Sequence, residues 1–196
     1  MRISLHHFAD ILTYPSPSLP EVVRSCQSAV AGTNPDAGKL LRKFASFVER
    51  TPLPLLEEEY TKVFDLDPKC FPSVGYHLFG ESYKRSVFLL GLKEHYRARG
   101  FSVDGELPDH LSVLLRYLAV TDDATFAHEL IEDAILPALE RMTGRSQSAG
   151  YDEQPEVNSA PMAPERAHYV SVLEALRMVL KDVAASVDGR NGARNG

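Results

Sequence analysis

The stretch that decides the fold is DATFAHELIEDAILPALERM, residues 123–142. Its apolar residues recur every three or four positions, the spacing that places side chains on one face of an α-helix. Pro137 lies inside the pattern, and because proline has no N–H to donate, we expect a kink there. The stretch therefore predicts a core helix. The apolar positions are Ala127, Leu130, Ile131, Ala134, Ile135, Ala138, Leu139 and Met142.

The same helical spacing continues along most of the chain on both sides of this stretch. Prolines and glycines separate the periodic segments, as they do at helix ends. We expect segment 67–79, which holds two prolines and a glycine, to be irregular. The predicted helices cover residues 3–14, 19–31, 36–50, 53–66, 80–99, 108–120, 123–142 and 166–187.

The pattern favours one helical domain and no sheet. No segment alternates apolar and polar residues around a hairpin turn, and no internal repeat occurs. We therefore predict an all-α fold, a single-domain bundle of seven or eight helices over residues 1–187. Residues 144–165 are rich in Gly, Ser and Pro without a period, which predicts a long loop. Residues 188–196 are expected to form a disordered tail.

Length indicates how the core is stabilised, and net charge indicates which classes of binding partner to expect. The chain has 196 residues, enough to bury a core without help from a metal or a disulfide. Acidic residues outnumber basic ones by 27 to 21, which gives a net charge of -6. Nucleic-acid binding needs clustered Lys and Arg, so we expect no nucleic-acid partner. A basic partner would be attracted, since complementary charge steers encounter.

The N-terminus and the cysteines indicate a cytoplasmic protein. The first 15 residues, MRISLHHFADILTYP, are too polar for a signal peptide. No run approaches the ~18–20 apolar residues that cross a membrane, so we expect no membrane span. Cys26 and Cys70 form no CxxC motif and no zinc-type array. Both are expected to be free thiols in a reducing compartment.

The most reactive-looking stretch is ELPDH, residues 106–110. It places Glu106, Asp109 and His110 within five residues, and such groups can form an acid–base site when they converge on one atom. The local signals favour another interpretation. Pro108 suits the first position of a helix, and a carboxylate in the first turn is stabilised by the helix dipole. We expect this stretch to start a helix, with His110 partly exposed.

No other motif indicates catalysis. The chain has seven histidines but no HExxH and no histidine pair four residues apart. The nucleophile elbow, the phosphate-binding loop and the dinucleotide fingerprint are all missing. One enzyme hypothesis stays open, a metal-dependent hydrolase that uses His77, Asp109 and His110 brought together by folding.

Three consecutive acids, residues 57–59, allow two interpretations. On a helix they spread over about 200° of the circumference, so some of them face solvent. They form either a solvated acidic face or an acidic rim beside an apolar groove, which would suit a basic amphipathic peptide. Taken together, the residues favour a binding protein over an enzyme.

Three stretches, read in order, resemble one known family, the NarJ branch of the TorD/DmsD/NarJ redox-enzyme maturation chaperones. The N-terminal LHHFADILTYP (5–15) extends the resemblance more loosely. The resemblance implies an all-α fold, a cytoplasmic location and no catalysis. The three stretches are LEEEYTKVFDL (56–66), GYHLFGESYKRSVFLLGLKEHYRARGF (75–101) and ELPDHLSVLLRYLA (106–119).

The resemblance also implies a client protein. Chaperones of the NarJ branch bind the N-terminal peptide of the nitrate reductase catalytic (alpha) subunit and promote insertion of the molybdenum cofactor into it. Molybdenum cofactor biosynthesis proteins are implied as further partners, and no cofactor is expected to stay bound to the chaperone. The resemblance places the following residues in or beside the peptide groove: Glu58, Tyr60, Phe64, Tyr76, His77, Phe79, Tyr83, Lys84, Arg85, Glu106, Leu107, Pro108, Asp109 and His110.

Our mechanistic hypothesis is helix-in-groove recognition. The apolar face of the peptide would lie on Leu, Phe and Tyr side chains, and its basic residues would meet Glu58, Glu106 and Asp109. Two alternatives remain besides the hydrolase. One is a chaperone for a related respiratory molybdoenzyme, and the other is a structural scaffold without a groove.

Overall fold

The computed structural model describes residues 2–103, 105–145 and 164–192, without the side chains of 2, 164–166 and 187–192. The described residues contain helices and no strand, which confirms the all-α prediction. Two π-helical segments, η1 (Thr61–Asp65) and η3 (Leu130–Ile135), and a 3-10 turn, η2 (Pro68–Cys70), interrupt or extend them. The α-helices are α1 (Arg2–Ile11), α2 (Leu19–Ala31), α3 (Pro35–Val48), α4 (Leu53–Tyr60), α5 (Val74–Phe79), α6 (Tyr83–Ala98), α7 (Leu111–Val120), α8 (Ala124–Glu129), α9 (Leu136–Met142) and α10 (Pro164–Gly192).

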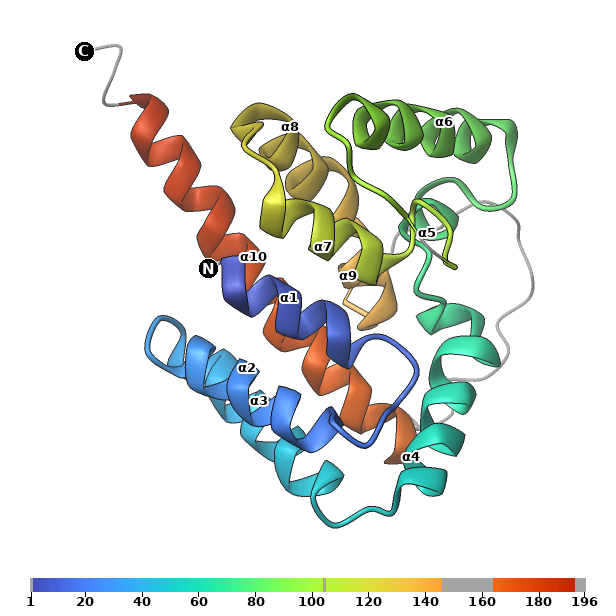
Figure 1. Cartoon of the computed structure of the whole chain (residues 1–196), viewed down its shortest axis with the longest axis vertical. Helices are drawn as coiled ribbons and strands as arrows, with labels where there is room; N and C mark the ends of the chain where they lie inside the picture. Colours follow the sequence, from blue (N-terminus) through green and yellow to red (C-terminus); the bar gives the residue numbers. More distant parts are fainter. Residues whose placement is uncertain (1, 104, 146–163, 193–196) are drawn as a thin grey trace.

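The helices pack around the long α10. Helices α2 and α3 form a hairpin that lies against α10 on one side, and α9 lies against it on the other. Helix α1 bridges the two parts, because it contacts both α2 and α7. Helix α6 lies at the top edge in Figure 1, away from α1, α2 and α3, and its closest backbone neighbour is α5.

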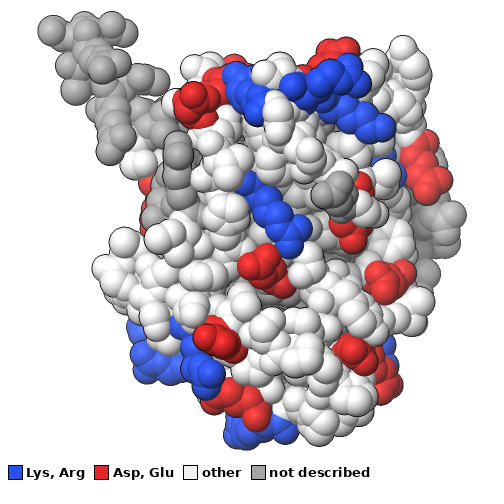
Figure 2. All heavy atoms as spheres, in the orientation of Figure 1, with Lys and Arg blue, Asp and Glu red and all other residues white. Residues whose placement is uncertain are grey.

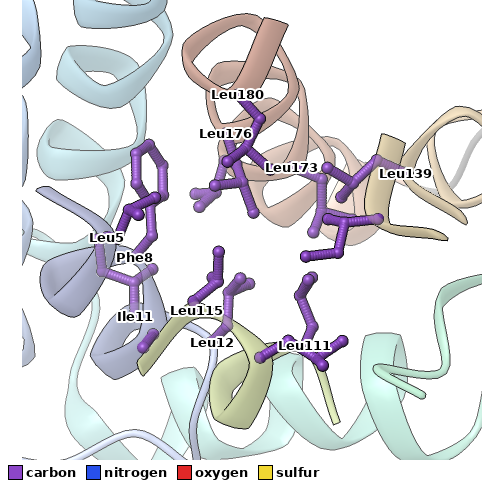
Figure 3. Close-up of a cluster of buried hydrophobic side chains, with 14 of the residues drawn as sticks. Leu5, Phe8, Ile11, Leu12, Leu111, Leu115, Leu139, Leu173, Leu176 and Leu180 are labelled. Carbon is purple, nitrogen blue, oxygen red and sulfur yellow. The ribbon is translucent and has the colours of Figure 1, made fainter. Parts of the chain in front are cut away.

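The core is made by the apolar faces that the helical spacing predicts. Figure 3 shows leucines and other apolar side chains of α1, α7, α9 and α10 pointing into one shared interior. Leu111 and Leu115 of α7 and Leu173 and Leu176 of α10 are fully buried there. This continuous apolar interior supplies the main favourable term in folding.

Segment 67–79 corrects one prediction. It was expected to be irregular, but it contains the 3-10 turn η2 and the short helix α5, the one α-helix of the described chain that the sequence analysis did not predict. A six-residue helix is too short to be stable alone. Val74 and Gly75 are buried in it, so tertiary packing stabilises what the local sequence does not.

The stretch 123–142 is helical from Ala124 to Met142, as α8, η3 and α9, and Asp123 caps its start. The chain does not leave the helix at Pro137. The irregularity instead precedes it, because η3 widens the helix to π geometry over Leu130–Ile135. Pro137 cannot donate to the preceding turn, and a π-helical segment is one way in which a helix absorbs such a disturbance.

The C-terminal helix is longer than predicted. Helix α10 begins at Pro164 and runs to Gly192, so residues 188–192 of the predicted tail are helical. Residues 146–163 of the predicted loop and residues 193–196 of the tail lie outside the described residues. In the part of the chain that is described, no helix is long and apolar enough to cross a membrane. Cys26 and Cys70 are both buried and are not joined in a disulfide, as predicted.

Candidate functional site

The ELPDH stretch crosses the segment before α5. The Leu111 N–H donates to the Pro72 carbonyl at 2.7 Å, and the Val74 N–H donates to the Asp109 carbonyl at 2.9 Å. Ser73 and His110 form an isolated antiparallel bridge between them. These bonds hold the backbone extended, so α7 begins at Leu111 and not at residue 108 as predicted. Tertiary hydrogen bonds here outweigh the helix-start signal of Pro108.

His110 is the N-cap residue of α7. Its Nδ1 accepts a hydrogen bond from the Ser112 N–H at 3.2 Å and lies 2.7 Å from the Ser112 Oγ. Nδ1 is therefore unprotonated, and the proton of the neutral ring is on Nε2, which lies 3.9 Å from Glu106 Oε2. The residue is buried, not partly exposed as predicted. Burial lowers the pKa of His110, and the Glu106 and Asp109 carboxylates oppose this shift.

Asp109 is fully buried and forms an ion pair with Arg85 of α6, Nε to Oδ2 at 3.1 Å. Helix α5 packs closely against this ion pair at Gly75. A Cβ on Gly75 would lie 2.8 Å from Asp109 Oδ2 and 3.0 Å from Phe88 Cδ1. The Tyr96 hydroxyl of α6 adds a second tie, because it donates to the Pro108 carbonyl at 2.9 Å. Asp109 was expected to face a guest peptide, but its charge is used inside the protein to attach α6.

The hydrolase hypothesis finds no support in this geometry. His77 Nε2 donates to the Phe71 carbonyl at 2.7 Å, and burial lowers the pKa of His77 although this hydrogen bond acts in the opposite direction. His77, Asp109 and His110 are thus each bound to a different protein group. The described residues contain no group of three His, Cys, Asp or Glu side chains that could hold a metal ion.

A tyrosine of α4 lies beside the end of α1. The rings of Tyr14 and Tyr60 meet edge to face at 5.6 Å, and the Tyr60 hydroxyl donates to the Leu12 carbonyl at 3.2 Å. Burial raises the pKa of Tyr60, and the Asp65 and Glu106 carboxylates raise it further. Both acids are therefore within electrostatic reach of this ring.

The same two acids also act on His110, whose pKa each of them raises. The end of α1 contacts Tyr60, and the acids at the end of η1 and in the ELPDH stretch lie within electrostatic range of it. We call this region the tyrosine–acid face and define it by Tyr14, Tyr60, Asp65, Glu106 and His110. Tyr14 is 57% exposed and the Glu106 side chain is 50% exposed, so the face offers both an aromatic ring and a carboxylate to solvent.

Two exposed apolar side chains follow the two acids in the sequence: Leu66 is 70% exposed and Leu107 is 50% exposed. Phe64, by contrast, lies in the core, where its ring packs on Tyr60 at 4.8 Å and on Tyr169 at 5.0 Å. Glu58 is exposed and forms an ion pair with Lys62 at 2.8 Å.

Four other predicted residues, Tyr76, Phe79, Tyr83 and Lys84, line a hollow of about 800 Å³ at the turn between α5 and α6. Gly80 makes this turn possible because its φ of 60° is one that residues with a side chain rarely adopt. Basic side chains gather over α6 at the top of the face shown in Figure 2.

A second concave surface was not predicted. It lies between α5, α6 and the α8–η3 segment, has a volume of about 360 Å³, and we call it the α6–α8 cleft. Phe79 is the one predicted residue that lines it. The sequence held two signals for it: a glycine in the middle of a helix, and two acids spaced i, i+4 in the 123–142 stretch. Its lining residues are Leu78, Phe79, Phe88, Gly91, Leu92, His95, Phe126, Glu129, Leu130, Asp133 and Ala134.

Comparison with known proteins agrees with this architecture. Residues 31–146 match the family described as nitrate reductase delta subunit. A solved structure from Archaeoglobus fulgidus, described as a redox enzyme maturation protein, has a similar fold, with a TM-score of 0.59 and 22% sequence identity. The similarity covers 92% of this chain and 94% of that one. A search of curated proteins finds no significant match.

Proposed function

Because the chain belongs to the nitrate reductase delta subunit family, whose members are redox-enzyme maturation chaperones and not enzymes, we propose that it binds the N-terminal peptide of the catalytic subunit of respiratory nitrate reductase. The bound subunit would then be held ready for insertion of its molybdenum cofactor in the cytoplasm. The cofactor is cargo for the client in this proposal, and we assign none of the described residues to it.

The observation that supports this proposal is the tyrosine–acid face. It joins three segments that are far apart in the sequence, and the family match includes two of them. Exposed Tyr14, Leu66 and Leu107 can cover the apolar side of an amphipathic peptide. Apolar burial would supply most of the affinity, at roughly 25 cal/mol per Å² before the costs of association are subtracted.

Charge would orient the peptide on this face. Asp65 and Glu106 are exposed carboxylates of this face. The sequence predicted the charge-binding role for Glu58, Glu106 and Asp109; we keep Glu106 and assign Asp65 in place of the buried Asp109. The chain as a whole carries -6, so a basic peptide would also be steered toward it over longer range.

The experiment is isothermal titration calorimetry with a synthetic peptide of the nitrate reductase N-terminus. We expect the charge reversal Asp65→Lys/Glu106→Lys to weaken binding about tenfold or more, because two attractions become repulsions. Glu21→Lys/Asp36→Lys is the matched control, since it makes the same charge change on the exposed surface of α2 and α3. Equal affinities of the two double variants would refute the assignment of the face.

The alternative client, a related respiratory molybdoenzyme, is tested in the same titration. The N-terminal peptide of such an enzyme is compared with that of nitrate reductase at equal salt. Tighter binding of the second peptide, still lost in the Asp65→Lys/Glu106→Lys variant, would keep the face and change the client.

A further inference from the structure

The α6–α8 cleft has a preformed apolar lining. The rings of Phe79 and Phe88 pack at 5.6 Å, and the imidazole of His95 stacks on Phe126 at 3.7 Å. Leu92 is almost fully buried beneath them. The volume of about 360 Å³ is at the small end of the range of ~300–1,000 Å³ for ligand pockets. It therefore suits the anchoring side chains of a larger partner better than an entire small molecule.

Gly91 places no side chain in this cleft. It lies in the middle of α6, where a glycine destabilises a helix by about 1 kcal/mol relative to alanine. A Cβ on Gly91 would meet nothing within 4 Å, and its φ is not among the positive ones, so neither packing nor backbone conformation requires glycine. What the missing side chain leaves is open space in the α6–α8 cleft, which Gly91 lines.

Two carboxylates mark the rim. Glu129 and Asp133 line the cleft, both are exposed, and their i, i+4 spacing places them on the same side of the helix. No lysine or arginine lines the cleft, and within the described ranges neither acid forms an ion pair. Like charges on adjacent turns repel each other, so a cation from a partner would relieve the repulsion as well as gain an attraction.

We propose that the α6–α8 cleft is a second binding site, separate from the tyrosine–acid face, for an amphipathic basic helix. A leucine or an aromatic side chain of the partner occupies the space beside Gly91, between Phe88 and Phe126. A lysine or arginine one turn away on the partner lies against Glu129 and Asp133. The site thus binds an apolar side chain and a basic side chain of the same helix, as in helix-in-groove recognition.

The test uses the full chain and a 14-residue Leu/Lys peptide of helical periodicity as the probe, with binding measured by calorimetry. Gly91→Leu fills the cleft and is expected to weaken binding about tenfold or more, since one buried anchor is lost. Gly91→Ala is the matched control: it removes the glycine without filling the space, so the affinity should stay within about twofold.

Charge is tested in the same way. Glu129→Lys/Asp133→Lys should weaken binding of the probe about tenfold, and a Leu/Glu peptide of the same pattern should not bind the unmodified chain. Asp122→Lys/Glu132→Lys is the control pair, because both residues are exposed, lie in or next to the same α8–η3 segment and do not line the cleft. Equal losses in both pairs would reduce the effect to net charge and overturn the proposal.

Its failure is distinguishable from failure of the proposed function. The nitrate reductase peptide is titrated into the Gly91→Leu and the Asp65→Lys/Glu106→Lys variants in parallel. If the two sites are separate, only the Asp65→Lys/Glu106→Lys variant should lose binding of the nitrate reductase peptide. If only Gly91→Leu loses it, the cleft is the site of the client peptide, and the proposal of a second site is wrong. Probe binding that Gly91→Leu leaves unchanged also overturns it.

Discussion

Helices α6 and α7 each contain eight apolar residues, in sixteen positions for α6 and in ten for α7, and they have opposite positions in the fold. Helix α7 is buried on nearly all sides, from Leu111 to Ala119. Helix α6 has two buried residues, Leu92 and Tyr96, and leaves Tyr83, Val87 and Leu90 more than half exposed. One helix is enclosed by others, whereas the other is fastened at a few points and leaves apolar surface free. The difference separates residues that stabilise the fold from residues available to partners.

The largest effect should come from truncating α7. Leu114→Ala removes a fully buried side chain and leaves a cavity, so we expect a loss of about 2–5 kcal/mol in the free energy of unfolding. Leu90→Ala on α6 should change it by less than about 0.5 kcal/mol, because Leu90 is 58% exposed. Urea denaturation measures both. Similar losses would show that α6 and α7 are equally important to the core.

The ion pair that fastens α6 comes next. Asp109→Ala leaves the Arg85 guanidinium unpaired, and we expect a loss of about 2–4 kcal/mol, less than for a fully enclosed pair because Arg85 is 18% exposed. Glu58→Ala breaks the exposed pair with Lys62 and should change stability by about 0–1 kcal/mol. A small effect of Asp109→Ala in the same denaturation assay would mean that α6 is held by other contacts.

Alanine substitutions at two glycines should change the stability in opposite directions. Gly75→Ala places a Cβ 2.8 Å from Asp109 Oδ2, so overpacking should destabilise the protein by about 1–3 kcal/mol. Gly91→Ala meets nothing within 4 Å and should stabilise it by about 0.5–1 kcal/mol through helix propensity. Thermal unfolding of the two variants checks the signs. A destabilising Gly91→Ala would contradict the open cleft.

The smallest effect is expected for the pH dependence of the free energy of unfolding, to which His110 of the ELPDH stretch contributes. Burial lowers the pKa of His110, so below the unfolded value of about 6.5 the unfolded chain binds more protons than the folded one. Stability should therefore be highest above that pH and fall as the pH drops from about 6.5 toward the folded pKa. His77 and His168, whose pKa values burial also lowers, act in the same direction.

The variant His110→Asn keeps a capping side chain and removes the titrating ring. Its free energy of unfolding should fall less between pH 7 and pH 5 than that of the unmodified chain, measured by denaturation at each pH. Identical slopes would show that the other histidines account for the whole dependence.

The helices were largely predictable because their signals are local. The spacing of apolar residues located eight helices, and Leu19–Ala31 was predicted at its observed bounds. Gly100, the first residue after the predicted helix 80–99, has a φ of 64°, and the Phe101 N–H donates to the Tyr96 carbonyl at 2.9 Å. The errors occurred at the ends of α10, at α5 and at the start of α7. At α5 and α7, contacts between distant segments decide the backbone.

The candidate site was predictable only in part. Resemblance pointed to the ELPDH stretch and to Tyr60, which the proposed site includes, but it could not separate the exposed Glu106 from the buried Asp109, three residues away. Both are carboxylates before the same helix, so local pattern treats them alike. Their roles differ because Arg85 reaches one of them and solvent reaches the other.

By itself, the amino-acid sequence determined the all-α class, the position of most helices, the free thiols and the acidic balance. These follow from periodicity, helix-end residues and composition, which do not depend on distant parts of the chain. Only the tertiary structure decided which apolar residues of α6 stay exposed, that His110 caps a helix, and that Gly91 lines a cleft. The physical reason is that an apolar surface is buried only when a second surface packs on it. An apolar face becomes core or docking surface according to what packs on it, and that partner lies far away in the sequence.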